Sequence, residues 1–424
     1  MLCAANPYIA TKNLVNFQGG ILTVGPLRFD LSRRGNVYVL GAGKATFPIA
    51  KALKEILGER ITEGLIIVKK DQEGTLKGIK VRRASHPIPD KEGLEAAKDI
   101  KRIAEKAQKD DIVFCAITGG SSALMPLPVS SIGLEEKRRV NELLLASGAT
   151  IREINTVRKH LSDIKGGKLA LSILPGEIIN LTVSDVIEDP LDYITGPTVP
   201  DTSTFSEAVS VLKRYNLWGK FPQSAICYLQ NASSELETPK DFGEFKSLVH
   251  SFILIRSGTI CEAAAEKAKE FGFMPLILTT MLEGESREVG VMFAGIAKEI
   301  KHCNRPLPPP CAIIAGGETT VKIDGKCGQG GPNQEFALSA ALQLASYDKV
   351  VIAALDTDGT DGPTDIAGGL IDDSTIKRAK ENKFDVFKHL LEHDASPVLL
   401  SLDDAIITGS TGTNANDLKI LLVD

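Results

Sequence analysis

The sequence lacks the features that direct a protein to a membrane, a nucleic acid or a secretory route. No stretch approaches the about 18 consecutive apolar residues of a transmembrane helix. The 49 Lys and Arg against 54 Asp and Glu give a net charge of −5, whereas nucleic-acid binders usually carry a basic excess. Met1–Pro7 shows no charged-then-apolar signal pattern. We therefore expect a cytoplasmic protein with neither a membrane nor a nucleic-acid partner.

Cysteine is present, but in no pattern of known chemistry. None of the seven stands in C-x-x-C spacing, and none pairs with a His at zinc-finger spacing. Cys115 and Cys311 lie inside apolar runs, which is typical of small buried hydrophobic residues. Neither a disulfide framework nor a structural metal is expected.

Short apolar runs alternate with amphipathic stretches along the 424 residues, of which 43% are hydrophobic. This alternation predicts βαβ units, and continuous apolar strands predict a parallel sheet covered on both faces. The expected strands are 37–41, 64–68, 112–118, 178–183, 252–255, 275–278, 311–315 and 350–355, separated by helices such as 47–57, 92–107, 135–147, 287–300 and 334–344. Alternation over 319–323, bounded by Gly-Gly and Asp-Gly, predicts a hairpin strand and hence a mixed second sheet.

Two stretches could separate domains. Residues 233–240 are polar and turn-rich, and residues 304–310 form a short proline-rich connector. We place the boundary in the first, which predicts domains over 1–238 and 239–424.

Ligands of open α/β sheets bind at the carboxyl ends of strands, so the loops there are informative. Two such loops in the first half, 41–46 and 118–123, combine glycines with Lys44 or with hydroxyls, which suits an anion cradle. The first is neither a P-loop nor a full dinucleotide fingerprint, because Thr46 stands where the third Gly belongs. An ordinary strand-to-helix turn remains the alternative for both. The candidate contacts are Gly41, Gly43, Lys44, Gly119, Gly120, Ser121 and Ser122.

A basic segment and an acidic strand end follow. For Arg158 and Lys165 a ligand role and a solvated helix face are equally supported, whereas Lys159 is interpreted as solvated. His160 is interpreted as packed or hydrogen-bonded rather than catalytic. Asp185, directly after a strand, suits either a general base or a magnesium ligand.

The second half adds three polar loops: 316–320 with 328–335, then 356–365, then 408–417. The middle loop holds four carboxylates in ten residues, which suits Mg²⁺ or substrate, although Asp-Gly turns occur without metal. Glycine and hydroxyl cradles, one basic segment and acidic loops together favour phosphoryl transfer, where catalysis is mostly positioning and charge neutralisation.

These motifs, in this order, resemble the glycerate 2-kinase family, whose second half is a MOFRL-type domain. The resemblance spans nearly the whole chain and includes Gly41–Ala45, His86–Asp90, Gly119–Leu124, Asn155–Ser162, Ser184–Val186, Gly316–Val321, Asn333–Glu335, Asp356–Pro363 and Thr411–Asn414. It implies a Rossmann-like N-terminal domain, a mixed-sheet α/β second domain, and an active site in the cleft between them. The resemblance is also compatible with an extreme N-terminal segment that packs on the second domain, and with a homodimer.

The implied reaction transfers the γ-phosphate of ATP to the 2-hydroxyl of D-glycerate, with Mg²⁺ as cofactor. We expect Lys44 to neutralise phosphate charge, Asp185 to orient or deprotonate the hydroxyl, and Arg158 to grip carboxylate or phosphate. Further expected binding residues are Asn155, Lys165, Gly317, Glu318, Thr319, Asn333, Thr411 and Asn414, with Asp358 and Asp361 as metal ligands.

The sequence departs from the family at Pro332, where an Arg usually precedes the Asn-Gln-Glu motif. This departure puts ligand details of the second domain in doubt more than the reaction. The main alternative is an NAD(P)H-dependent hydroxypyruvate reductase, a label also given to members of this family. Against it, the third fingerprint Gly is missing, and Glu63 precedes its strand rather than following it.

Overall fold

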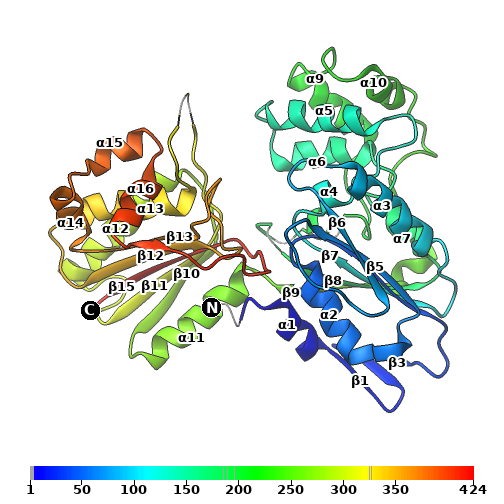
Figure 1. Cartoon of the computed structure of the whole chain (residues 1–424), viewed down its shortest axis with the longest axis horizontal. Helices are drawn as coiled ribbons and strands as arrows, with labels where there is room; N and C mark the ends of the chain where they lie inside the picture. The colour runs from blue at the N-terminus through cyan, green and yellow to red at the C-terminus, as the bar shows by residue number, and fades with distance from the viewer. Residues whose placement is uncertain (1–3, 185, 189, 195, 324, 326) are drawn as a thin grey trace. The chain divides into compact units, whose positions relative to one another are not determined.

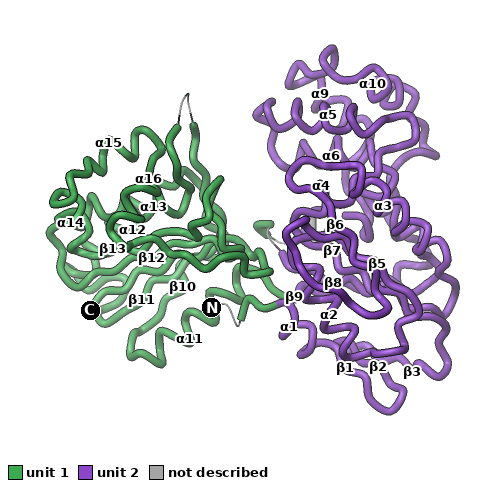
Figure 2. Tube along the Cα trace, in the orientation of Figure 1, with its two compact units in different colours: residues 1–6, 185–188, 255–424 green, residues 7–184, 189–254 purple. Residues whose placement is uncertain are grey.

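The computed structural model describes residues 4–424 except 185, 189, 195, 324 and 326. It contains two compact units, shown in Figure 2: unit 1 comprises Met1–Asn6, Asp185–Glu188 and Ile255–Asp424, and unit 2 comprises Pro7–Ser184 and Asp189–Leu254. The main division thus falls later in the chain than the boundary at residue 238 that the sequence predicts. The reason is strand β9 (Val249–Ile255), which joins the sheet of unit 2.

Unit 2 is built on a six-stranded sheet of order β6-β5-β4-β7-β8-β9 (Figure 1). The first five strands of that order pair in parallel. Their bounds are β4 Val37–Ala42, β5 Glu63–Lys69, β6 Ile79–Ala84, β7 Ile112–Ile117 and β8 Glu177–Val183. Every residue of β4, β7 and β8 is buried, which confirms the covered parallel sheet predicted from their continuous apolar runs.

Helices of unit 2 cover this sheet and add a separate layer. Helix α2 (Thr46–Leu57) contacts β4, β5 and β7, while α3 (Lys91–Ala104) and α7 (Lys168–Ile173) share a core with the sheet. A second core joins α5 (Leu134–Leu145), α6 (Ile151–His160), α9 (Phe205–Arg214) and α10 (Gln223–Gln230). The remaining elements are α1 Pro7–Leu14, η1 Gly58–Arg60, α4 Ser121–Leu124, α8 Leu191–Ile194, η2 Gly243–Leu248, and an antiparallel sheet of β1 Val15–Gln18, β2 Ile21–Val24 and β3 Leu27–Asp30.

Unit 1 contains a mixed sheet of order β10-β11-β15-β12-β13-β14. Its strands are β10 Met274–Leu282, β11 Cys311–Gly317, β12 Val350–Asp356, β13 Gly368–Asp372, β14 Ala405–Ile406 and β15 Asp417–Val423. The mixed sheet is confirmed, but the predicted hairpin strand over 319–323 is wrong. That segment forms a single bridge, between Thr320 and Glu285. The sheet is mixed instead because β15 inserts between β11 and β12 and pairs antiparallel with both, and because the β12–β13 and β13–β14 pairs are antiparallel as well.

Helices lie on both sides of the mixed sheet, with α11 (Ser257–Glu270) on one side and α12 (Ser286–Cys303) and α13 (Pro332–Leu344) on the other (Figure 1). Phe293 of α12 and Phe336 of α13 pack edge to face, with ring centroids 5.1 Å apart. Three short helices complete the unit: α14 Thr375–Glu381, α15 Val386–Leu391 and α16 Ala395–Ser401. Within the described part of the chain, no helix has the length and apolarity needed to cross a membrane.

Candidate functional site

The two glycine-rich loops of unit 2 follow the neighbouring parallel strands β4 and β7 and pack on each other. The backbone N–H of Lys44 donates to Gly119 O at 2.9 Å, and that of Ala45 donates to Thr118 Oγ1 at 3.1 Å. Gly43 has φ +141°, and a Cβ there would lie 2.1 Å from Thr118 Oγ1, so this approach requires glycine. The structure therefore brings together the predicted residues of both loops.

Thr46, which replaces the third glycine of a dinucleotide fingerprint, has a local structural role. It begins α2, and its Oγ1 donates to Ala116 O of β7 at 3.0 Å. A Cβ on Gly41 would lie 2.6 Å from the Thr46 methyl group. The hydroxyl of Thr46 therefore connects the start of α2 to β7 at this turn.

Helix α6 presents two predicted residues on one face, because Asn155 and Arg158 are three positions apart. The Arg158 Nε donates to Asn141 Oδ1 of α5 at 3.1 Å. Beyond the helix, Lys165 Nζ donates at 2.6 Å to Ser122 Oγ of α4, the short helix that follows the glycine-rich turn after β7. Among the described residues, neither Arg158 nor Lys165 forms an ion pair with a carboxylate.

The electrostatics of these cations are unusual. Burial lowers the pKa of Arg158. Burial, reinforced by the charges of Arg158 and Lys159, lowers the pKa of Lys165 to about 7. Perturbed pKa values of this kind gather at functional sites, although structural networks also produce them.

Lys137 of α5 belongs to the same group and was not predicted. Its exposed fraction is 2%, and its Nζ has no hydrogen-bond partner among the described residues. Burial, together with the charges of Arg158 and Lys165, lowers the pKa of Lys137 to about 7. The sequence carries no signal for this position, because Lys137 stands in a run of five charged residues, 135–139, that looks like a solvated helix face.

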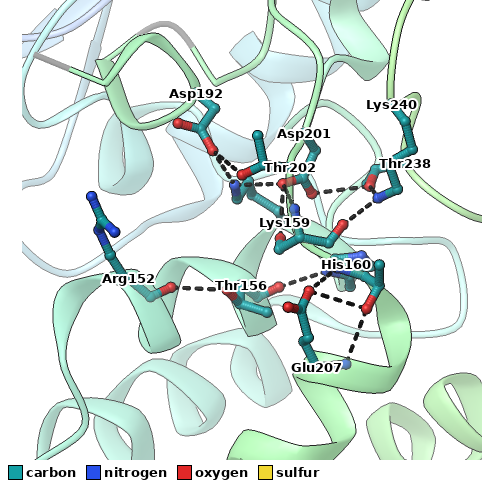
Figure 3. Close-up of polar contacts among 12 residues, drawn as sticks. Arg152, Thr156, Lys159, His160, Asp192, Asp201, Thr202, Glu207, Thr238 and Lys240 are labelled. Atoms are coloured by element: carbon teal, nitrogen blue, oxygen red, sulfur yellow. Dashed lines mark hydrogen bonds and ion pairs between the residues drawn. The ribbon is translucent and has the colours of Figure 1, made fainter.

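The opposite side of α6 anchors the helix (Figure 3). Lys159 is buried, and its Nζ lies 2.6 Å from Asp201 Oδ1 and 3.2 Å from Asp192 Oδ2, so the solvated interpretation of Lys159 is wrong. His160 is packed and hydrogen-bonded as predicted, with its ring nitrogens 2.7 Å from Thr156 O and 2.8 Å from a carboxylate oxygen of Glu237. These contacts fix the helix that carries Arg158.

In unit 1, Asp361 caps helix α13. It is 1% exposed, and its carboxylate accepts four hydrogen bonds of 3.0–3.1 Å, from the backbone and side-chain amides of Asn333 and Gln334. Pro332 is the first residue of this helix, a position that needs no N–H. Burial, together with the charge of Asp417, raises the pKa of Asp361 to about 6.

The loop after β12 also meets the loop before β15. The Thr411 N–H donates to Asp358 O at 3.2 Å, and Thr411 Oγ1 donates to Thr357 O at 2.6 Å. Asp358 Oδ1 itself accepts from the backbone and hydroxyl of Thr360. Asn414 lies in the same C-terminal loop, between Thr411 and β15.

The third loop of unit 1 follows β11. Gly317 has φ +138°, and a Cβ there would lie 2.2 Å from Leu282 N. The Glu318 N–H donates to Leu282 O at 2.8 Å, and the Thr319 N–H donates to Asp417 Oδ2 at 3.3 Å. Unit 1 thus gathers the predicted residues Gly317, Glu318, Thr319, Asn333, Asp358, Asp361, Thr411 and Asn414 around the ends of β11, β12 and β15. Asp185 lies outside the described residues.

Comparison with known proteins gives a consistent family. Residues 1–230 match the domain of unknown function DUF4147, and residues 311–417 match the MOFRL family. The chain is 42% identical to a glycerate 2-kinase of Pyrococcus horikoshii, over 99% of this chain and 94% of the relative. It is 38% identical to a putative hydroxypyruvate reductase of Agrobacterium vitis, over 92% of this chain and 88% of the relative.

A solved structure agrees with the sequence relatives. The crystal structure of a glycerate kinase from Thermotoga maritima superposes with a TM-score of 0.87 at 37% identity, covering 100% of this chain and 96% of that one. Both halves of the chain, its full-length relatives and its α/β fold lead to one assignment: the chain belongs to the glycerate 2-kinase family, with a MOFRL domain in its C-terminal half.

Proposed function

We propose that this protein transfers the γ-phosphate of ATP to the 2-hydroxyl of D-glycerate, giving 2-phosphoglycerate and ADP. The observation that carries the proposal is in unit 2, where two interlocked glycine-rich loops lie beside cations that have no acidic partner among the described residues. Phosphoryl transfer needs this combination of positioning and positive charge, since the reacting groups are all anionic. The family relatives named glycerate kinase support the same reaction.

The roles proposed for individual residues follow from their placement. Lys44 stands in the loop after β4, where its ammonium would neutralise phosphate charge. Arg158 has a bidentate fork suited to a carboxylate or phosphate, and its Nη atoms form no hydrogen bond within the described structure. Asp185 follows β8 in sequence and is proposed as the group that orients or deprotonates the acceptor hydroxyl.

ATP and Mg²⁺ are proposed cofactors. Gly43 and Gly120 both have positive φ, +141° and +85°, a backbone conformation that favours glycine. Glycine-rich turns of this kind present backbone N–H groups that can bind phosphates. Within the described residues no three His, Cys, Asp or Glu side chains form a preformed metal site. Mg²⁺ commonly needs only one or two carboxylates besides nucleotide phosphates. We propose Asp358 as one of these, because a metal at Asp361 would compete with the four hydrogen bonds that cap α13.

One set of assays separates this function from the reductase alternative. Purified protein is tested for ADP release with and without D-glycerate, and for NADH and NADPH oxidation with hydroxypyruvate in the absence of ATP. The product is then offered to enolase, which accepts 2-phosphoglycerate and not the 3-isomer. Glycerate-dependent ADP release with an enolase-active product supports the proposal. ADP release independent of glycerate contradicts it, and hydroxypyruvate-dependent oxidation of a nicotinamide supports the reductase.

A further inference from the structure

Three cations gather between α5, α6 and the loop after β7. Lys137 and Asn141 are four residues apart on α5 and share a face, and Asn141 Oδ1 accepts from Arg158 Nε at 3.1 Å. Lys165 Nζ donates to Ser122 Oγ in α4, directly after the glycine-rich turn that follows β7. The charges of Arg158 and Lys165 both act on Lys137, and that of Arg158 acts on Lys165. The three side chains therefore form one electrostatic cluster.

The position of Lys137 is unfavourable for a cation in three ways. Its ammonium is buried and has no hydrogen-bond partner in the described part of the chain, so no such bond offsets its desolvation. It faces two like charges, and it stands in the first turn of α5, where the helix dipole disfavours positive charge. A methionine would fill similar space without these costs. A negative group brought into the cluster would reverse the balance, because each cation would gain an opposite charge in a region of low dielectric.

We propose that Lys137, Arg158 and Lys165 form a buried oxyanion subsite that binds a carboxylate or phosphate group through Arg158 and Lys165, with Lys137 as the buried charge behind them. Arg158 and Lys165 are partly exposed, so they can contact a ligand, whereas Lys137 is enclosed. Lys137 is thus a positioning residue that acts through the field it imposes. Only the identity of the ligand, the carboxylate of glycerate or a phosphate of the nucleotide or product, rests on the proposed function.

Lys137→Met tests the subsite, with Arg139→Met as the matched control. Arg139 lies on the same helix, is exposed, and pairs with Glu142 at 3.2 Å, so its replacement removes the same charge from the surface. Thermal unfolding is followed for wild type and both variants while D-glycerate, inorganic phosphate and Mg-ATP are titrated separately. We expect Lys137→Met to raise the half-saturating concentration of at least one ligand tenfold or more, whereas Arg139→Met leaves all three within about twofold.

The ligand affected identifies the source of the oxyanion. Weakened glycerate binding with unchanged Mg-ATP assigns a carboxylate, and weakened phosphate or Mg-ATP binding assigns a phosphate. In steady-state kinetics KM for the affected substrate should rise more than kcat falls, because ground-state binding is lost. Should Lys137→Met not fold, Lys165→Met gives the same comparison at a partly exposed position.

Unchanged half-saturating concentrations for all three ligands in the variant would overturn the subsite. A variant that is more stable without ligand, but binds all three ligands as wild type does, also contradicts the subsite. Removing a buried unpaired charge would stabilise the protein even if Lys137 had only a structural role. The proposed function fails separately: a wild type without glycerate-dependent ADP release removes the kinase assignment. The subsite still stands in that case if inorganic phosphate stabilises wild type and Lys137→Met weakens this effect.

Discussion

The buried pair between Lys159 and Asp201 provides a quantitative test of how α6 is held. Both side chains are almost fully buried, with Nζ and Oδ1 2.6 Å apart. Asp201 also accepts hydrogen bonds from the backbone and hydroxyl of Ser203 and from Thr238. Asp201→Asn keeps the shape of the side chain but removes its charge, so Lys159 is left with Asp192 at 3.2 Å as its acidic partner within the described structure.

Removing one partner of a buried ion pair costs about 3–5 kcal/mol. Because Asp192 still compensates part of the Lys159 charge, we expect Asp201→Asn to lower the free energy of unfolding by an amount near the lower end, about 3 kcal/mol. Lowering the pH should reduce the difference in unfolding free energy between wild type and Asp201→Asn. Although burial opposes ionisation, the charge and hydrogen bond of Lys159 hold the pKa of Asp201 below its ordinary value of 3.8. Its stabilising contribution is therefore complete above pH 3.8 and is lost as the pH falls through the folded-state pKa.

Urea unfolding followed by the fluorescence of Trp218, the single tryptophan, measures this effect. Trp218 packs against the helical core that contains Ile154 and Val157 of α6. Glu95→Gln is the control, since Glu95 forms an exposed pair with Lys98 at 2.8 Å and should change stability by less than about 0.5 kcal/mol. A loss below about 1 kcal/mol in Asp201→Asn would refute the reasoning. So would a difference from wild type that does not shrink on acidification.

Three further substitutions test the proposed catalytic roles, each measured as glycerate-dependent ADP release. Lys44→Met should lower turnover by more than about 100-fold, since a phosphate-neutralising cation is lost, and near-normal turnover would remove Lys44 from the site. Asp185→Asn should lower turnover similarly with an unchanged unfolding curve; if it only raises the Mg²⁺ requirement, Asp185 is a metal ligand and not a base. Asp358→Asn should raise the apparent Mg²⁺ requirement about tenfold, and an unchanged requirement would exclude Asp358 as a ligand.

Local patterns predicted much of the fold, for a physical reason. The strands and helices of the parallel sheet follow from hydrophobic periodicity, which each segment carries in its own residues. Loops at strand ends, such as those at Gly43 and Gly120, could be identified because neighbouring parallel strands bring their carboxyl ends to one edge. The antiparallel strand β15 was missed, since its place between β11 and β12 depends on pairing with residues far away in the chain.

The sequence by itself determined the family, the α/β class and the loops that carry chemistry, because these depend on residue types in a fixed order. Only the tertiary structure decided which charged groups are buried and which groups lie next to them. Lys137 and Lys159 both stand in charged helical segments that look solvated. Within the described structure, however, Lys137 has no hydrogen-bond partner and Lys159 pairs with Asp201. The free energy of a charge depends on its solvation and on neighbours distant in sequence, and both are fixed only when the helices pack.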